Sequence, residues 1–354
     1  MHGARRGQGE HKLRGVSARD RDGDAVRLHV VTGKGGTGKT TVASSLALAL
    51  AAGGRTVLLV EVEGRQGVAQ VFGSRPLPYA ERPIAEAAEG GRVCALAADA
   101  EAALLEYLEM FYGMRRAGQV LTRFGAVDFA TTIAPGMRDV LLTGKATEAV
   151  RRRSGDRRRG GREAGGGRYV YDAVVMDAPP TGRIAQFLNV NAEVAGLARV
   201  GPIRNHADKV MDTIRSAQTA VHFVTVLEEM PAQETLDGIA EIRSAGLNVG
   251  SLIVNMVRPP FFAEPVLQAV AEGSFDTGAL VRGLKAAGLE DAEDTARGLA
   301  AEVGDHALRV AGESEIRERL AGVDRPHLEL PLLGAGVGPG QLHDLAARLR
   351  EQGL

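Results

Sequence analysis

The stretch Gly33-Lys34-Gly35-Gly36-Thr37-Gly38-Lys39-Thr40 matches the pattern G-x-x-x-x-G-K-[ST]. The apolar run from Arg27 to Val31 precedes it and predicts a buried strand, and the Ala- and Leu-rich run from Thr41 to Ala52 predicts a helix after it. Glycines let backbone N–H groups turn toward a phosphate, and the following helix adds its positive N-terminal end. This strand–loop–helix context predicts a phosphate-binding loop, the P-loop.

Two side chains of the P-loop have distinct predicted roles. Lys39 is expected to reach the β- and γ-phosphate oxygens of ATP, and the Thr40 hydroxyl is expected to bind Mg²⁺. Lys34 is a second lysine, which a phosphate site within one chain does not need. ATP and Mg²⁺ are therefore the predicted cofactors, and the residues expected to contact the nucleotide here are Gly33, Lys34, Gly35, Gly36, Thr37, Gly38, Lys39, Thr40 and Thr41.

Apolar runs that alternate with helical patterns predict the rest of the fold. Strands are expected at 56–62, 93–98, 173–176, 221–226, 251–254 and 327–330, and a last helix at 341–350. This alternation indicates an α/β fold with a doubly wound, mostly parallel sheet. We expect one ATPase domain over 26–354, with a helical subdomain inserted at about 100–150 and a disordered N-terminus over 1–25.

The span from Arg151 to Arg168 breaks every pattern. It holds eight Arg against Asp156 and Glu163, with six Gly among them. Such a composition cannot form a core and predicts a mobile loop. An anion- or nucleic-acid-binding loop is the alternative, although basic runs without aromatic residues are typical of a solvated surface.

Composition excludes several classes of protein. The formal net charge of -1 provides no overall attraction to nucleic acid or to an anionic bilayer. No apolar run reaches the ~20 residues of a membrane span, so an integral membrane protein is not expected. The single cysteine, Cys94, excludes an internal disulfide and a Cys-pair metal site. We expect a cytoplasmic protein, either free or peripheral to a membrane, without a specific nucleic-acid partner.

Further motifs resemble those of a known family. The run Asp177-Ala178-Pro179-Pro180-Thr181-Gly182 follows a predicted strand and closely resembles the switch D-T-A-P-T-G of the arsenite-pump and tail-anchored-protein targeting ATPases. Val254-Asn255-Met256, Leu330-Pro331-Leu332-Leu333 and Ala134-Pro135-Gly136 are similar to that family's V-N-Q, L-P-L-L and P-G elements. Together with Lys34, these motifs identify the chain as a deviant Walker A ATPase, a divergent member of an actinobacterial type.

The resemblance implies a role for each matched residue. Asp177 would hold Mg²⁺ through a water molecule, and Thr181 and Gly182 would sense the γ-phosphate. Asn255 and Pro331 would lie near the adenine. Lys34 would cross a dimer interface to the partner's nucleotide, which implies a homodimer or a heterodimer with a paralogous ATPase.

The chain departs from this family's first switch. Glu63-Gly64-Arg65-Gln66 stands where the family has D-P-A-H, whose Asp positions the attacking water. Glu63 offers the same carboxylate on a longer side chain, so slow hydrolysis is expected, because the reaction is sensitive to displacements of about 1 Å. In the competing hypothesis Glu63 is a strand-end charge and Glu61 an equally exposed neighbour. Strand alternation places both on one side, so they could also share the task.

Three functions compete at this point. The first is an ATPase whose ATP-driven dimer closure controls a client-binding helical surface; Met110, Phe111, Tyr112, Met114 and Met137 could line such a groove or merely pack the helices together. The second is a partitioning or septum-site type ATPase, although Leu342, Leu345 and Leu349 predict a docked rather than a membrane-binding C-terminal helix. The third is a weakly hydrolysing subunit of a hetero-oligomer with an active paralogue. For the first of these functions, the expected partner is a protein client or a membrane protein.

Overall fold

The computed structural model describes residues 26–103, 106, 136–154, 167–197, 202–259, 261–334 and 336–354. The predicted disordered N-terminus, most of the predicted helical subdomain and the centre of the Arg/Gly-rich span lie outside these residues. So do Met110, Phe111, Tyr112 and Met114 of the suggested client groove.

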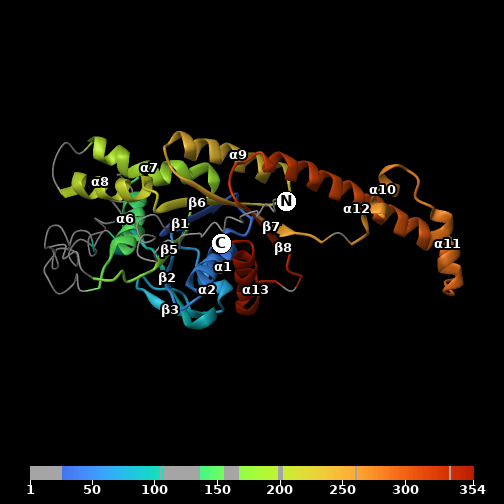
Figure 1. Ribbon diagram of the computed structural model, residues 1–354, viewed down its shortest axis with the longest axis horizontal. Helices are drawn as coiled ribbons and strands as arrows, with labels where there is room; N and C mark the ends of the chain where they lie inside the picture. Colours follow the sequence, from blue (N-terminus) through green and yellow to red (C-terminus); the bar gives the residue numbers. More distant parts are fainter. Residues whose placement is uncertain are drawn as a thin grey trace, which may run out of the picture.

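Within these ranges eight strands form one sheet, in the order β3-β4-β2-β5-β1-β6-β7-β8 (Figure 1). All neighbouring pairs are parallel except the antiparallel pair of β3 and β4. The predicted α/β fold with a mostly parallel sheet is confirmed. The strands are β1 (Leu28–Gly33), β2 (Thr56–Glu61), β3 (Arg82–Ala87), β4 (Gly91–Ala97), β5 (Ala173–Asp177), β6 (Thr219–Thr225), β7 (Val249–Val257) and β8 (His327–Pro331).

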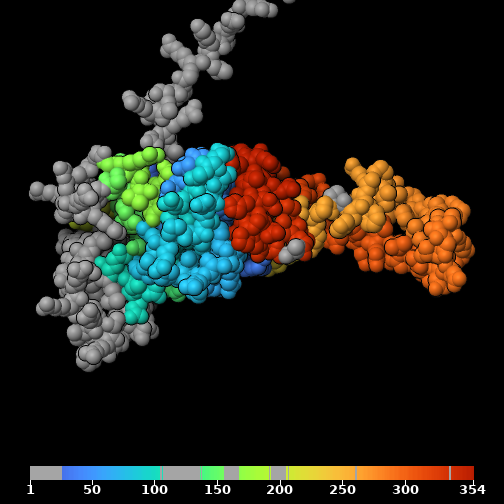
Figure 2. Space-filling view, turned by 90° about the horizontal axis from the view of Figure 1, so that it is seen from below, coloured from blue at the N-terminus to red at the C-terminus, as the bar shows by residue number. Residues whose placement is uncertain are grey.

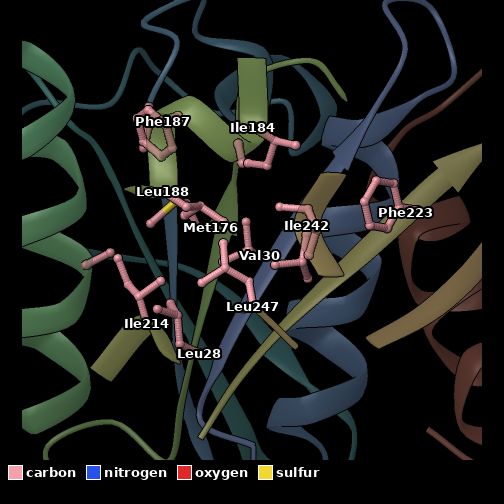
Figure 3. Packing of buried hydrophobic residues seen from close by; sticks show 14 of the residues in the cluster. Leu28, Val30, Met176, Ile184, Phe187, Leu188, Ile214, Phe223, Ile242 and Leu247 are labelled. Carbon is pink, nitrogen blue, oxygen red and sulfur yellow. The ribbon is translucent and has the colours of Figure 1, made fainter. Parts of the chain in front are cut away.

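The sheet is covered on both faces. One core joins it to α6 (Met137–Arg151), α7 (Thr181–Leu197), α8 (Pro202–Arg215) and α9 (Glu229–Ser244), and Figure 3 shows side chains of β1, β5 and α7 packed together there. A second core joins the opposite face of the sheet to α1 (Lys39–Ala51), α2 (Gly67–Val71) and α13 (Pro339–Glu351). Strand β1 contributes Leu28 and Val30 to the first core and Val31 to the second. Burial on both faces explains its continuous apolar run.

The expected strands and helices are found, with small shifts of their ends. Helix α1 begins at Lys39, two residues before the predicted start, because Gly38 is its N-cap. Helix α13 is a docked helix as predicted, since Leu342, Leu345 and Leu349 are fully buried in the second core. Strand β3 was not predicted, because this edge strand is largely exposed; a short 3₁₀ turn, η1 (Ala88–Gly90), connects it to β4.

A helical arm projects from one side of the sheet (Figures 1 and 2). It consists of α10 (Glu264–Ala271), α11 (Thr277–Ala286) and α12 (Ala292–Ala321), and α12 alone is about 45 Å long. Ile316 and Leu320 anchor the end of α12 in the first core. No residue of α10 or α11 is fully buried, because both helices pack against α12 and not against the sheet. No helix in the ranges given above is long and apolar enough to cross a membrane.

The two ends of the Arg/Gly-rich span, which was predicted to be a mobile loop over 151–168, make regular backbone contacts. Arg153 pairs with Tyr169 in an antiparallel bridge, and the Ser154 N–H donates to the Arg168 carbonyl at 2.7 Å. The Arg152 guanidinium, whose side chain is only 13% exposed, donates to both oxygens of Glu81 at 2.7 and 2.8 Å. Composition missed this because the carboxylate that pairs with Arg152 lies 71 residues away.

Candidate functional site

The carboxyl ends of the central strands gather most of the predicted site residues. β1 runs directly into the P-loop at Gly33 and has β5 and β6 as neighbours. The register pairs Val31 of β1 and Glu61 of β2 with the same residue, Asp177, at the end of β5. In open parallel sheets, ligands bind outside these strand ends. The topology therefore makes one site out of segments that are far apart in sequence.

The P-loop is held in place from β7. The Asn255 side-chain amide donates to the Thr37 carbonyl at 2.9 Å, and both residues are buried. Gly38 has φ +84°, and a Cβ at this position would lie 2.4 Å from the Asn255 Nδ2 atom. Only glycine fits there. Asn255, predicted to lie near the adenine, thus fastens the P-loop itself.

Two oxygen ligands of the kind that Mg²⁺ prefers meet at the start of α1. The Thr40 hydroxyl donates to Asp177 Oδ2 at 2.6 Å. Burial raises the pKa of Asp177 to about 6, while the Thr40 hydrogen bond and the charge of Lys39 act in the opposite direction. A hydroxyl and a carboxylate suit Mg²⁺, so the residues present fit the predicted metal. Elsewhere in the described ranges no cluster of three or more His, Cys, Asp or Glu could hold a metal ion.

The two glutamates at the carboxyl end of β2, Glu61 within the strand and Glu63 after it, have different environments. Glu61 is 2% exposed, and its carboxylate accepts hydrogen bonds from the Gly67 N–H at 3.0 Å and from the Val68 N–H at 3.2 Å. Glu63 has a side chain that is 22% exposed, and its nearest ion partner is Arg65 at 3.9 Å. The hypothesis of two equally exposed glutamates is wrong, because Glu61 is buried and bound to the backbone, whereas Glu63 is partly exposed.

The start of α7 lines one cavity together with Glu63. Thr181 is buried, and none of the described residues pairs with its hydroxyl, whereas Gly182 is exposed. The Thr32 hydroxyl donates to the Pro179 carbonyl at 2.7 Å and so ties this segment to β1. A cavity of about 200 Å³ separates it from the start of α6, lined by Val62, Glu63, Arg65, Arg138, Asp139, Leu142, Pro179, Arg183 and Phe187.

Lys34 is held by a residue that no motif predicted. Its ammonium lies 2.8 Å from Glu234 Oε1 on α9, and the two side chains are 30% and 39% exposed. Glu234 belongs to an ordinary amphipathic helix with no motif of its own, and only the folded chain brings it to the P-loop. The ion pair draws Lys34 toward α9, on a partly exposed surface.

The residues predicted to lie near the adenine also come together. Pro331 at the end of β8 pairs with Val257 at the end of β7, and the Leu332 N–H donates to the Val257 carbonyl at 2.9 Å. Met256 adopts φ +57°, a left-handed conformation unusual for methionine. Met256 and Leu332 are 39% and 42% exposed. This edge of the sheet thus presents apolar side chains beside Asn255, a suitable surface for a flat base.

Comparison with known proteins agrees with this geometry. The sequence profile of the anion-transporting ATPases matches residues 26–217, more than half of the chain. ATPase BagA of Mycobacterium tuberculosis is 50% identical over 329 residues, which cover 93% of this chain and 94% of that protein. An arsenical pump-driving ATPase of Aquifex aeolicus is 22% identical over 70% of this chain and 85% of that protein. ATPase GET3 of Kluyveromyces lactis is 24% identical over 66% of this chain and 72% of that protein.

The resemblance inferred from the motifs is therefore confirmed. The matched profile includes the P-loop and the Asp177 segment, and the alignment with BagA extends over nearly the whole chain. The chain belongs to the anion-transporting ATPase family and is an ATP-binding ATP hydrolase.

Proposed function

We propose that the chain is a Mg²⁺-dependent ATPase in which Lys39 binds the terminal phosphates and Thr40 and Asp177 hold the metal ion. The 2.6 Å hydrogen bond between Thr40 and Asp177 supports this assignment, because it brings the two predicted metal-binding oxygens together. Mg²⁺, when bound there, would neutralise charge on the phosphates. The backbone N–H groups from Gly33 to Thr41 bind the phosphate oxygens, and Asn255 and Pro331 border the adenine.

Glu63 positions the attacking water in this proposal. Its carboxylate lines the cavity beside the start of α7 and, unlike that of Glu61, has no backbone partner among the residues that the structure describes. Thr181 and Gly182 report the state of the γ-phosphate to α7, and the Thr181 hydroxyl, which has no partner within the described ranges, is a suitable donor for a phosphate oxygen. A carboxylate that orients water typically contributes ~10²–10⁴-fold to the rate.

The observation that carries the dimeric part of the proposal is the ion pair of Lys34 with Glu234. A lysine that completed its own phosphate site would point toward Lys39 and Thr40, but Lys34 is held on a partly exposed surface by α9. Exposed ion pairs of this kind contribute about 0.2–1 kcal/mol, so Lys34 can exchange Glu234 for a phosphate of a second subunit at little cost. We infer a dimer, formed with a second copy or with a paralogous ATPase, in which each Lys34 completes the partner's site.

Dimer closure on ATP would then change the exposure of a surface that binds a client protein or a membrane-protein partner. The cavity between Glu63, Asp139 and Arg183 supports such coupling, because it lies where the water-positioning loop meets the first turns of α6 and α7. Arg183 lies 3.4 Å from Asp139, so a movement of α7 on hydrolysis would pull on α6. The runner-up is a weakly hydrolysing subunit of a hetero-oligomer, favoured by the longer side chain of Glu63.

Mixing two inactive variants tests the role of Lys34. Lys34→Ala keeps its own Lys39, and Lys39→Ala keeps its own Lys34. If Lys34 acts on the partner's nucleotide, a mixed dimer contains one complete site, and mixing should restore ATP turnover that neither variant shows alone. Lys285→Ala, which removes another surface ion pair, is the matched control and should keep full turnover.

The proposal fails if the mixture stays inactive, or if Lys34→Ala alone hydrolyses ATP and dimerises at the wild-type level by light scattering. A wild-type chain with background turnover, alone and with candidate paralogues, would contradict the assignment of Glu63.

A further inference from the structure

We propose that Glu61 is a positioning residue for ATP hydrolysis, which closes the loop from Glu61 to Gly67 and so determines where Glu63 lies. This inference rests on the proposed function, in which Glu63 positions the attacking water. It assigns no contact with the reacting atoms to Glu61 itself.

The carboxylate of Glu61 joins the two ends of this loop. One oxygen accepts from the Gly67 N–H at 3.0 Å and the other from the Val68 N–H at 3.2 Å. Hydrogen bonds to a charged acceptor are about twice as strong as neutral ones, and a site that is 2% exposed is little screened by solvent. The end of β2 and the start of α2 are thereby fixed to each other.

Gln66 anchors the same loop to a second segment. Its side-chain amide donates to the Leu77 carbonyl at 3.1 Å, and its amide oxygen accepts from the Leu77 N–H at 2.7 Å. Gln66 itself adopts φ +58°, a left-handed conformation that these two bonds help to hold. Between the anchors, Val62 is buried and its N–H donates to the Asp177 carbonyl at 3.4 Å. Glu63, Gly64 and Arg65 form the tip of the loop, so the anchors set the position of the tip.

The closed end of the loop packs directly against the metal-binding side of the P-loop. A Cβ added to Gly67 would lie 3.2 Å from Thr40 Cγ2 and 3.4 Å from Thr40 Oγ1. The Thr40 hydroxyl in turn donates to Asp177, which is the register partner of Glu61. Glu61 therefore fixes the distance between the loop that carries Glu63 and the residues that hold the phosphates and the metal.

Replacing Glu61 by glutamine tests this role. The glutamine amide oxygen can accept only one of the two backbone N–H groups comfortably, because its NH₂ group then faces the other donor. The loop should loosen, and a displacement of about 1 Å at Glu63 should lower kcat about 10²-fold. The Kd of Mg-ATP should stay within about twofold of wild type, since Lys39, Thr40 and Asp177 are intact. Glu315→Gln, on the exposed side of α12, is the control and should keep the wild-type kcat.

A double variant distinguishes positioning from an independent role. If Glu61 acts through Glu63, then Glu61→Gln combined with Glu63→Gln should be no slower than Glu63→Gln alone. Multiplied effects of the two substitutions would overturn the inference, as would a wild-type kcat for Glu61→Gln. If Glu63→Gln hydrolyses ATP normally while Glu61→Gln is slow, both the water-positioning role of Glu63 and the inference fail. A slow Glu63→Gln with a normal Glu61→Gln refutes the inference alone.

A purely structural role of Glu61 predicts a different result for the Glu61→Gln variant. Loss of stability would lower the urea midpoint of Glu61→Gln and leave kcat per folded molecule unchanged, a result that refutes positioning. If the buried substitution prevents folding, Gln66→Ala loosens the loop from its partly exposed end and should also lower kcat at constant Kd. A wild-type kcat for Gln66→Ala in that case would overturn the inference.

Discussion

Acidification from pH 7 to pH 5 should destabilise the fold through two buried histidines, His29 of β1 and His222 of β6. Their rings stack with centroids 5.3 Å apart, and His29 Nδ1 lies 3.1 Å from His222 Nε2. His222 Nδ1 accepts from the Ser251 N–H at 3.0 Å, so the neutral His222 carries its proton on Nε2 and donates it to His29. An added proton on either ring would place two donors face to face.

The size of the effect follows from the pKa values. Burial lowers the pKa of His29 to about 4, which the Val26 carbonyl partly opposes, and burial next to His29 lowers the pKa of His222 to about 3. In the unfolded chain both groups titrate near 6.5. Because both pKa values are lowered in the folded chain, the free energy of unfolding has its full value above pH 6.5. It falls as the pH drops toward the pKa values of the folded chain. At pH 5 the loss is about 2 kcal/mol for each histidine, or about 4 kcal/mol together, a large part of a typical 5–15 kcal/mol.

Urea unfolding at pH 7.5, 6 and 5 measures this loss directly. The double variant His29→Asn/His222→Asn should be less stable than wild type at pH 7.5 but should lose about 4 kcal/mol less between pH 7.5 and pH 5. His343→Asn, which replaces an exposed histidine of α13, should follow the wild-type curve. Equal pH dependence in wild type and the double variant would refute the reasoning.

Three further substitutions probe the site and its surroundings. Lys39→Ala should abolish measurable ATP binding by calorimetry, because it removes the charge opposite the terminal phosphates; undiminished binding would contradict the whole assignment. Asn255→Ala should cost about 1–3 kcal/mol in urea unfolding and weaken ATP binding, because the buried Thr37 carbonyl loses its donor, whereas Asn248→Ala at an exposed hydrogen bond should change neither. Deleting 155–166 and joining the ends with a short Gly/Ser link should leave the melting temperature and turnover unchanged, but a deletion that also removes Arg152 should cost about 1–3 kcal/mol, since Glu81 would lose its partner. Equal melting temperatures for the two deletions would show that the Arg152 pair is dispensable.

The amino-acid sequence alone predicted the fold class and the P-loop, because both depend on short-range features. A phosphate loop needs its glycines, lysine and hydroxyl within eight consecutive positions, and the buried strands of a parallel sheet are continuous apolar runs. The segment that begins at Asp177 was found for the same reason. Sequence also located the C-terminal helix, whose leucines lie at helical spacing.

What the sequence left open were choices between residues of the same type. Glu61 and Glu63 have the same side chain and the same strand alternation, yet Glu61 is bound to the backbone of α2 and Glu63 lines the cavity beside the start of α7. The difference depends on where the chain turns after β2, which alternation does not encode. The arm formed by α10, α11 and α12 was not predicted, because α10 and α11 pack against α12, and the sequence of a single helix does not show which other element it packs on.

Only the tertiary structure decided which distant residues meet. Thr40 contacts Asp177 across 137 positions, Asn255 contacts Thr37 across 218, and Lys34 contacts a glutamate of α9 that belongs to no motif. These contacts follow from the strand order, which places β1 between β5 and β6 and so gathers the strand ends at one edge. Strand order is set by the packing of both sheet faces as a whole, so no local stretch of sequence contains it.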